Sequence, residues 1–250
     1  MLVAVSRPDR VLVAPFHWLA LQGPDSATRL KDGTAVTDGT QTDAEGTIQF
    51  AYGLGAPIDF ELPEPLFATL RAWRRVLCKL ELVGRDPERY GGLGFGNLSV
   101  REPDQPTRFI ITASQTSGAR DLYRSDLVRI MACSLDRFWV EAEGSKPPSS
   151  ETLSHAMIYA ADPRVDCVLH AHSPVLWRRA ADLGLACTAP DVPYGSPAMA
   201  AAVAELLGRD HDRPLVFITD GHEDGVFACG ADPDATGTAL VAALARALRA

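Results

Sequence analysis

The sequence lacks long hydrophobic runs: no stretch approaches the roughly 18 consecutive apolar residues that a membrane-spanning helix requires. The apolar start, residues 1–5, is soon interrupted by Arg7, Pro8 and Asp9, so it is too short for the core of a signal peptide. Clusters of basic residues are also missing, and the net charge of −8 argues against nucleic acid or an anionic membrane surface as partner. We therefore expect neither a membrane nor a nucleic-acid partner.

Cysteine is sparse and shows no pairing pattern. The five cysteines are widely spaced, and none belongs to a C-x-x-C pair. Such usage is typical of a reduced protein whose cysteines pack in the core, so we expect a cytoplasmic location. The hydrophobic content of 46% and the charged content of 22% are ordinary for a globular chain, and 250 residues suffice to bury a full core.

Residues 1–62 show little periodicity. They are rich in Gly, Pro, Thr and Asp, with turn signals such as 31–34 and short β-like runs at 11–14 and 47–52. We expect an irregular N-terminal extension that packs on the main domain or on a neighbouring subunit. The regular domain then spans residues 63–250.

This domain mixes helix-like and strand-like patterns. An apolar stripe marks a helix between about 63 and 84, with most of its charged residues, Arg74 among them, off the stripe. Further helices are expected at 152–161, 177–183, 197–207 and 236–249, and strands at 98–101, 109–112, 127–131, 138–142, 165–173, 215–219 and 226–229. Because the two kinds do not alternate strictly, the pattern predicts a layered α/β fold whose sheet is not purely parallel.

Two histidines lie on the buried strand that Pro174 ends. Successive side chains of a strand point to opposite faces, so His170 and His172 share one face. Two imidazoles placed in this way can bind one divalent metal ion, with each nitrogen about 2.0–2.1 Å from zinc. A pair of hydrogen-bonded core histidines is the alternative, and the spacing alone does not decide between them.

Polar loops supply candidate partners for such a site. Ser149, Ser150 and Glu151 open the helix at 152–161, where they either cap its first turn or hold a phosphate, with Glu151 as general base. Neutral donors in two other loops can join them in an anion cradle or be simple turn residues: Gly96, Asn97, Thr116, Ser117 and Gly118.

The turn at 220–225 offers a third metal ligand. His222, Glu223 and Asp224 are all chemically able to bind zinc, so spacing cannot choose among them. His155, one helical turn beyond Glu151, is treated as structural or as a neighbour of the site.

The order of these motifs resembles the class II aldolase/adducin family. Gly96–Ser99, the strand and loop at 111–118, Ser149–Glu151 and His170–Pro174 follow one another as in that family. The resemblance covers roughly residues 64–248. It implies a three-layer α/β/α sandwich with a central, mainly antiparallel sheet, commonly assembled as a homotetramer with its sites at subunit interfaces.

The resemblance also implies a divalent metal ion, most commonly Zn²⁺, on three histidines. His170 and His172 become two ligands, and we expect His222 as the third. Asp224 is the reserve, because it occupies the position before the strand-entering glycine where the family usually has its histidine. Glu151 becomes the catalytic acid/base. The implied phosphate cradle consists of Gly96, Asn97, Ser117, Gly118, Ser149 and Ser150.

The expected function is that of a metal-dependent aldolase-type lyase. It would act on a small hydroxy-carbonyl substrate of the sugar-phosphate kind through a metal-stabilised enediolate. Epimerisation or dehydration uses the same chemistry, and a non-catalytic adducin-like scaffold is the alternative outside enzymes. Glu151 favours the aldolase branch, since the epimerases have Asp there. The aldolases also use a tyrosine near the C terminus, but no tyrosine follows Tyr194, which leaves the general acid unassigned.

Overall fold

The computed structural model describes residues 47–56, 62–103, 105–192, 196–209 and 212–249, all within one compact unit, residues 35–250. Most of the predicted N-terminal extension, including the β-like run at 11–14, lies outside the described residues. Its packing and the domain boundary at residue 62 therefore stay predictions.

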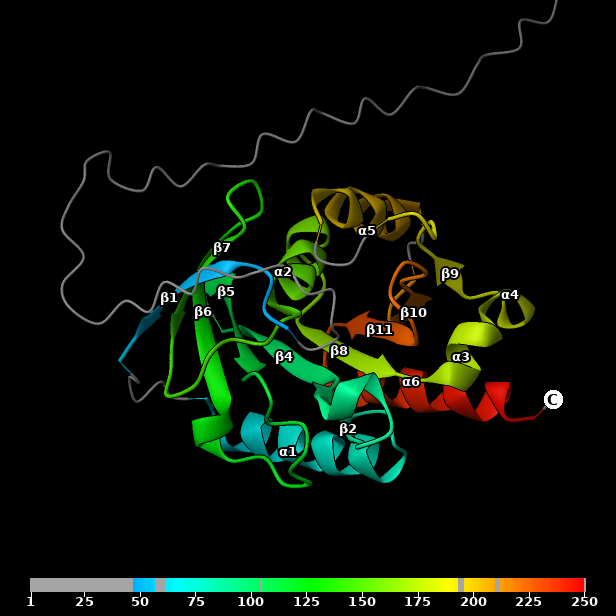
Figure 1. The fold of residues 1–250 in the computed structure, drawn as a ribbon, viewed down its shortest axis with the longest axis horizontal. Helices are drawn as coiled ribbons and strands as arrows, with labels where there is room; N and C mark the ends of the chain where they lie inside the picture. The colour runs from blue at the N-terminus through cyan, green and yellow to red at the C-terminus, as the bar shows by residue number, and fades with distance from the viewer. Residues whose placement is uncertain (1–46, 57–61, 104, 193–195, 210–211, 250) are drawn as a thin grey trace, which may run out of the picture. The chain divides into compact units, whose positions relative to one another are not determined.

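Two pairs of helices cover the two faces of one sheet (Figure 1). Helices α2 (Thr152–Ala161) and α5 (Pro197–Arg209) contribute to the apolar cluster on one face. Helices α1 (Glu64–Lys79) and α6 (Pro233–Ala247) contribute to a separate cluster on the other. The predicted three-layer α/β/α sandwich is confirmed.

The main sheet has nine strands in the order β1-β7-β6-β5-β4-β8-β11-β10-β9. Neighbouring strands are antiparallel except at the edges, where β1 pairs with β7 and β9 with β10 in parallel. The strands are β1 (Ala51–Gly55), β4 (Asn97–Glu102), β5 (Gln105–Thr112), β6 (Leu127–Ser134), β7 (Trp139–Glu143), β8 (Cys167–His172), β9 (Ala186–Cys187), β10 (Leu215–Ile218) and β11 (Gly225–Gly230). A separate two-stranded ribbon pairs β2 (Gly84–Arg85) with β3 (Gly94–Phe95).

The register of the central strands brings three chain segments together. Strand β8 lies between β4 and β11, with Asn97 opposite His170 on one side and Gly225 opposite His172 on the other. The end of β8 thus meets the start of β4 and the start of β11. This point of the sheet carries the predicted histidine pair.

The structure departs from the predicted helices at two places. The helix expected at 177–183 is two short helices, α3 (Pro174–Arg178) and α4 (Ala180–Leu183), because Ser173 caps a new helix directly after β8.

On α1, Arg74 is fully buried although periodicity placed it off the apolar stripe. Its Nη2 donates to the carbonyl oxygens of Thr116, at 2.6 Å, and Ala119, at 3.0 Å.

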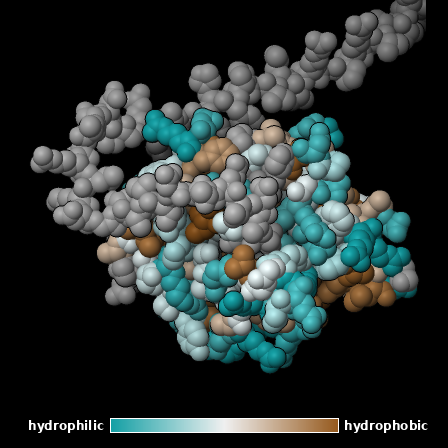
Figure 2. All heavy atoms as spheres, viewed as in Figure 1, coloured by the Kyte–Doolittle hydropathy of each residue, from teal (hydrophilic) through white to brown (hydrophobic). Residues whose placement is uncertain are grey.

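Within the residues that the structure describes, no helix combines the length and apolar character needed to cross a bilayer. On the face shown in Figure 2, hydrophobic residues gather over the C-terminal end of α6. Leu248, just beyond that helix, is exposed.

Candidate metal centre

Three buried histidines, His170, His172 and His222, converge at the end of β8. Each offers one ring nitrogen, and these atoms all lie within 4.8 Å of one another. Nε2 of His170 is 3.1 Å from Nε2 of His172. Two nitrogens on one tetrahedral zinc would be about 3.3 Å apart, because each Zn–N bond is about 2.0–2.1 Å long. The donor set therefore fits a divalent metal ion.

Strand β8 and its neighbour β11 set the orientation of the His170 ring. Nδ1 of His170 is 3.2 Å from the carbonyl oxygen of Val226, to which it donates, so Nε2 carries the lone pair that a metal needs. Phe227 stacks on the same ring, with centroids 4.3 Å apart. These contacts hold His170 in the tautomer and direction suited to coordination.

His222 comes from the turn between β10 and β11. Its backbone N–H donates to the carbonyl of Thr219 at 3.0 Å, and the N–H of Gly225 donates to the carbonyl of His222 at 2.9 Å. A Cβ on Gly225 would lie 2.6 Å from Oγ1 of Thr219 and 2.9 Å from Nδ1 of His222. Glycine at position 225 therefore leaves the space that the ring of His222 occupies.

Asp224, the reserve ligand, is directed to a different partner. Its Oδ2 accepts a 2.7 Å hydrogen bond from the hydroxyl of Tyr90. Burial raises the pKa of Tyr90, and the bond to Asp224 raises it further, so the phenol keeps the proton that it donates. The group of described residues that could hold an ion contains His222 and not Asp224.

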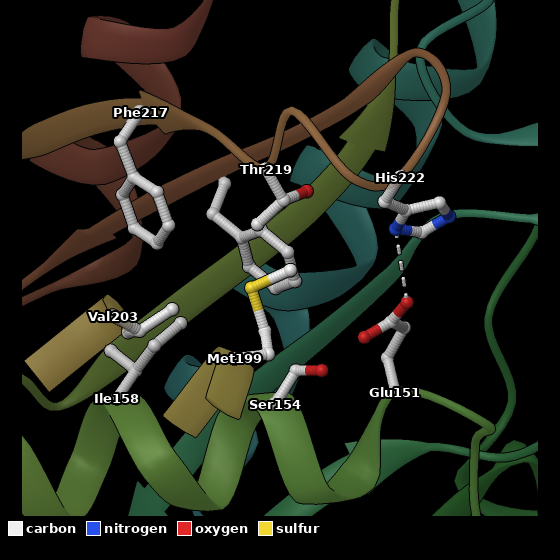
Figure 3. A pocket seen from close by; sticks show the side chains of 9 residues that line it. Glu151, Ser154, Ile158, Met199, Val203, Phe217, Thr219 and His222 are labelled. Carbon is white, nitrogen blue, oxygen red and sulfur yellow. Dashed lines mark ion pairs between the residues drawn. The ribbon is translucent and has the colours of Figure 1, made fainter. Parts of the chain in front are cut away.

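Glu151 lies beside the histidines. Its Oε1 is 3.7 Å from Nε2 of His170 and 3.5 Å from Nδ1 of His222 (Figure 3). Glu151 is the N-cap residue of α2, and its N–H donates to Oγ of Ser149 at 3.3 Å. The start of α2 thus presents a buried carboxylate to the candidate metal centre.

Glu151 lines a polar pocket. Among the described residues that line it, none is Lys or Arg. Oδ1 of Asn97 is buried and has no hydrogen-bond partner among the described residues. Gly118 is the one member of the predicted cradle that does not line this pocket; it packs beside Arg85. The lining residues are Gly94, Gly96, Asn97, Ala113, Ser114, Gln115, Ser117, Ser149, Ser150 and Glu151.

Glu151 also lines a second, apolar pocket (Figure 3). Glu151 and His222 form one end of it, and mainly aliphatic and aromatic side chains form the rest, together with Ser154 and Thr219. The lining residues are Glu151, Ser154, Ile158, Met199, Val203, Phe217, Thr219, His222 and Phe227. Glu151 is common to both pockets.

His155 belongs to a separate buried network. Its Nδ1 is 2.6 Å from Oγ of Ser99, and that hydroxyl is also 2.6 Å from Oη of Tyr159. Burial lowers the pKa of His155 to about 3, so the ring is neutral in the folded protein. These contacts give His155 a structural role inside the sandwich.

The fold and the site together describe a three-layer α/β/α domain with a histidine cluster at the end of its central strand. Residues 87–249 match the class II aldolase and adducin N-terminal domain family, and the chain belongs to this family.

One curated relative matches part of the chain. The methylthioribulose-1-phosphate dehydratase of Geobacillus kaustophilus is 32% identical over 106 residues, which are 42% of this chain and 46% of the relative. The chain thus matches less than half the length of this curated relative.

Solved structures show the same fold. The L-fuculose-1-phosphate aldolase from Thermus thermophilus is 22% identical, with a TM-score of 0.54 over 74% of this chain and 92% of that one. The sugar-phosphate aldolase from Thermotoga maritima is 16% identical, with a TM-score of 0.55 over 74% and 94% of the two chains.

Proposed function

We propose that the protein is a divalent-metal-dependent lyase that acts on a small hydroxy-carbonyl substrate with an anionic group, such as a sugar phosphate. One observation carries this proposal: His170, His172 and His222 converge with ring nitrogens within 4.8 Å of one another. The carboxylate of Glu151 lies 3.7 Å from His170 and 3.5 Å from His222. A bound ion, which we propose to be Zn²⁺, would act as a Lewis acid that polarises the substrate carbonyl and makes the neighbouring carbon more acidic.

Glu151 is the proposed acid/base. Glu151 lines both the polar and the apolar pocket, so a substrate that extends from one to the other passes its central carbons beside Glu151. A carboxylate at that position can take a proton from carbon or oxygen and return it later in the reaction.

The polar pocket is the proposed anion site. Ser149 and Ser150 lie where α2 begins, and the partial positive charge of a helix N-terminus favours an anion there. Asn97 and Ser117 add side-chain donors from two other segments. Gly118 remains a proposed backbone contact from the same loop as Ser117.

Dehydration is a second candidate reaction. It is supported by the name of the 32% identical relative, a dehydratase, and by the apolar pocket, which suits a substrate with an apolar substituent. Both reactions begin with proton transfer at Glu151. They differ in whether a carbon–carbon bond breaks or hydroxide leaves.

Product analysis by NMR separates these reactions. The metal-loaded protein is incubated in D₂O with a panel of ketose and aldose phosphates. Aldol cleavage yields two carbonyl fragments, whereas dehydration yields one product that has lost water. Loss of the histidine-bound metal without any change in substrate turnover would contradict the proposal.

We also propose a homotetramer in the cytoplasm, by analogy with the family. Sedimentation velocity tests the tetramer, which has about four times the mass of the 26.9 kDa chain.

A further inference from the structure

Tyr90 and Asp224 share an unusual backbone conformation. Both have positive φ, 50° for Tyr90 and 63° for Asp224, and a 2.7 Å hydrogen bond joins their side chains. Tyr90 also begins a run of left-handed residues that continues through Gly91 and Gly92. Non-glycine residues seldom adopt this conformation, and those that do concentrate at functional sites.

Asp224 is held at two points. Its carbonyl oxygen accepts the N–H of Ser173 at 2.9 Å, directly after the β8 histidines, and its carboxylate accepts the hydroxyl of Tyr90. Asp224 also lies two residues beyond His222, in the turn that carries the third histidine. Any shift of Asp224 would therefore move the backbone that places His222.

Tyr90 is fixed in turn by its own neighbours. Nη2 of Arg89 donates to its hydroxyl at 2.8 Å, and the guanidinium lies 4.6 Å from the centre of the Phe95 ring. The rings of Tyr90 and His172 pack in a T-shaped arrangement, with centroids 4.7 Å apart and the planes at 70°. Tyr90 thus touches one histidine of the cluster directly and is linked to another through Asp224.

We propose that Tyr90 and Asp224 are positioning residues for the metal centre. Their hydrogen bond holds the turn so that His222 faces His170 and His172 while the carboxylate of Asp224 is turned away. This inference rests on the proposed metal function. Residues that orient ligands in this way commonly contribute about 10- to 100-fold to metal affinity.

Cobalt titration of the metal-free full-length chain tests the proposal, because Co²⁺ reports both affinity and ligand geometry through its visible absorption. Tyr90→Phe removes the hydroxyl alone. Asp224→Gly removes the carboxylate but keeps the left-handed backbone accessible. Asp224→Asn retains an acceptor for Tyr90 and also tolerates positive φ.

We expect Tyr90→Phe and Asp224→Gly each to bind Co²⁺ about 10- to 100-fold more weakly than the wild type. Asp224→Asn should remain within a few-fold of wild-type affinity. The double variant Tyr90→Phe/Asp224→Gly should bind no more weakly than the weaker single variant, because both changes remove the same interaction. His222→Ala serves as the reference for loss of the third ligand.

Wild-type affinity in Tyr90→Phe overturns the inference. It is also overturned if Asp224→Asn loses affinity and changes the absorption spectrum while Tyr90→Phe does not, since Asp224 would then be a ligand. If the wild type takes up no Co²⁺, or if His222→Ala binds it equally well, the proposed metal centre itself fails. Circular dichroism checks that each variant is folded. If Asp224→Gly does not fold, Tyr90→Phe alone decides the outcome, because it differs from the wild type by only one oxygen atom.

Discussion

The carboxylate of Glu151 faces the ring of His222, with Oε1 3.5 Å from Nδ1 and both side chains buried (Figure 3). The glutamate comes from the start of α2, and the histidine comes from the turn before β11. The proposed acid/base group and a candidate metal ligand are thus brought together by two separate elements.

Replacing Glu151 by Gln should lower kcat by about 10²–10⁴-fold, because the amide cannot accept the substrate proton. Metal content should be unchanged, since the three histidines remain. Steady-state kinetics with the substrate identified by NMR, together with elemental analysis, measures both quantities. Glu141→Gln, an exposed change on β7, is the control. Full activity in Glu151→Gln would remove Glu151 from the mechanism.

Replacing His172 by Ala should abolish stoichiometric metal binding. The wild type should contain about one ion per chain after purification without chelators, and the variant almost none, because two remaining imidazoles bind zinc weakly. Plasma emission analysis measures the content. His155→Asn is the matched control, since that buried histidine lies in the Ser99 network and should leave the metal in place. Equal metal content in wild type and His172→Ala would contradict the site.

Local patterns were sufficient for much of this fold and for part of the site. Helix α2 spans the predicted residues 152–161, where the polar residues 149–151 precede a mainly apolar segment. The shared face of His170 and His172 follows from strand geometry alone. Such features depend on residues close together in the chain, so they can be predicted from the periodicity of the sequence.

Contacts between distant segments were not accessible in this way. Arg74 has the charge of a surface residue, yet it is buried because the carbonyls of Thr116 and Ala119 accept its N–H groups. The carboxylate of Asp224 likewise accepts a hydrogen bond from Tyr90, which lies 134 residues earlier in the chain. Periodicity and motif spacing carry no information on such partners.

A methyl group at position 225 should displace His222. In Gly225→Ala the new Cβ would lie 2.6 Å from Oγ1 of Thr219 and 2.9 Å from Nδ1 of His222, so the turn must shift. We expect Co²⁺ affinity to fall by about 10-fold or more, as for other changes that misplace a ligand. Gly208→Ala is the matched control, because its Cβ meets open space on α5. If Gly225→Ala bound Co²⁺ with the same affinity as the wild type, the turn would tolerate the methyl group and this prediction would be wrong.

Burial of neutral His155 should make the folded state sensitive to acid. Its pKa falls from 6.5 to about 3 on folding, so between these values the unfolded chain binds the extra proton. The free energy of unfolding is therefore fully retained above pH 6.5 and decreases as the pH falls towards 3, by about 2 kcal/mol from this residue between pH 7 and pH 5. Urea unfolding of the metal-free protein at the two pH values measures the loss, and His155→Asn should show a smaller one. The other histidines are common to both proteins, so an identical pH dependence would mean that His155 is not the group responsible.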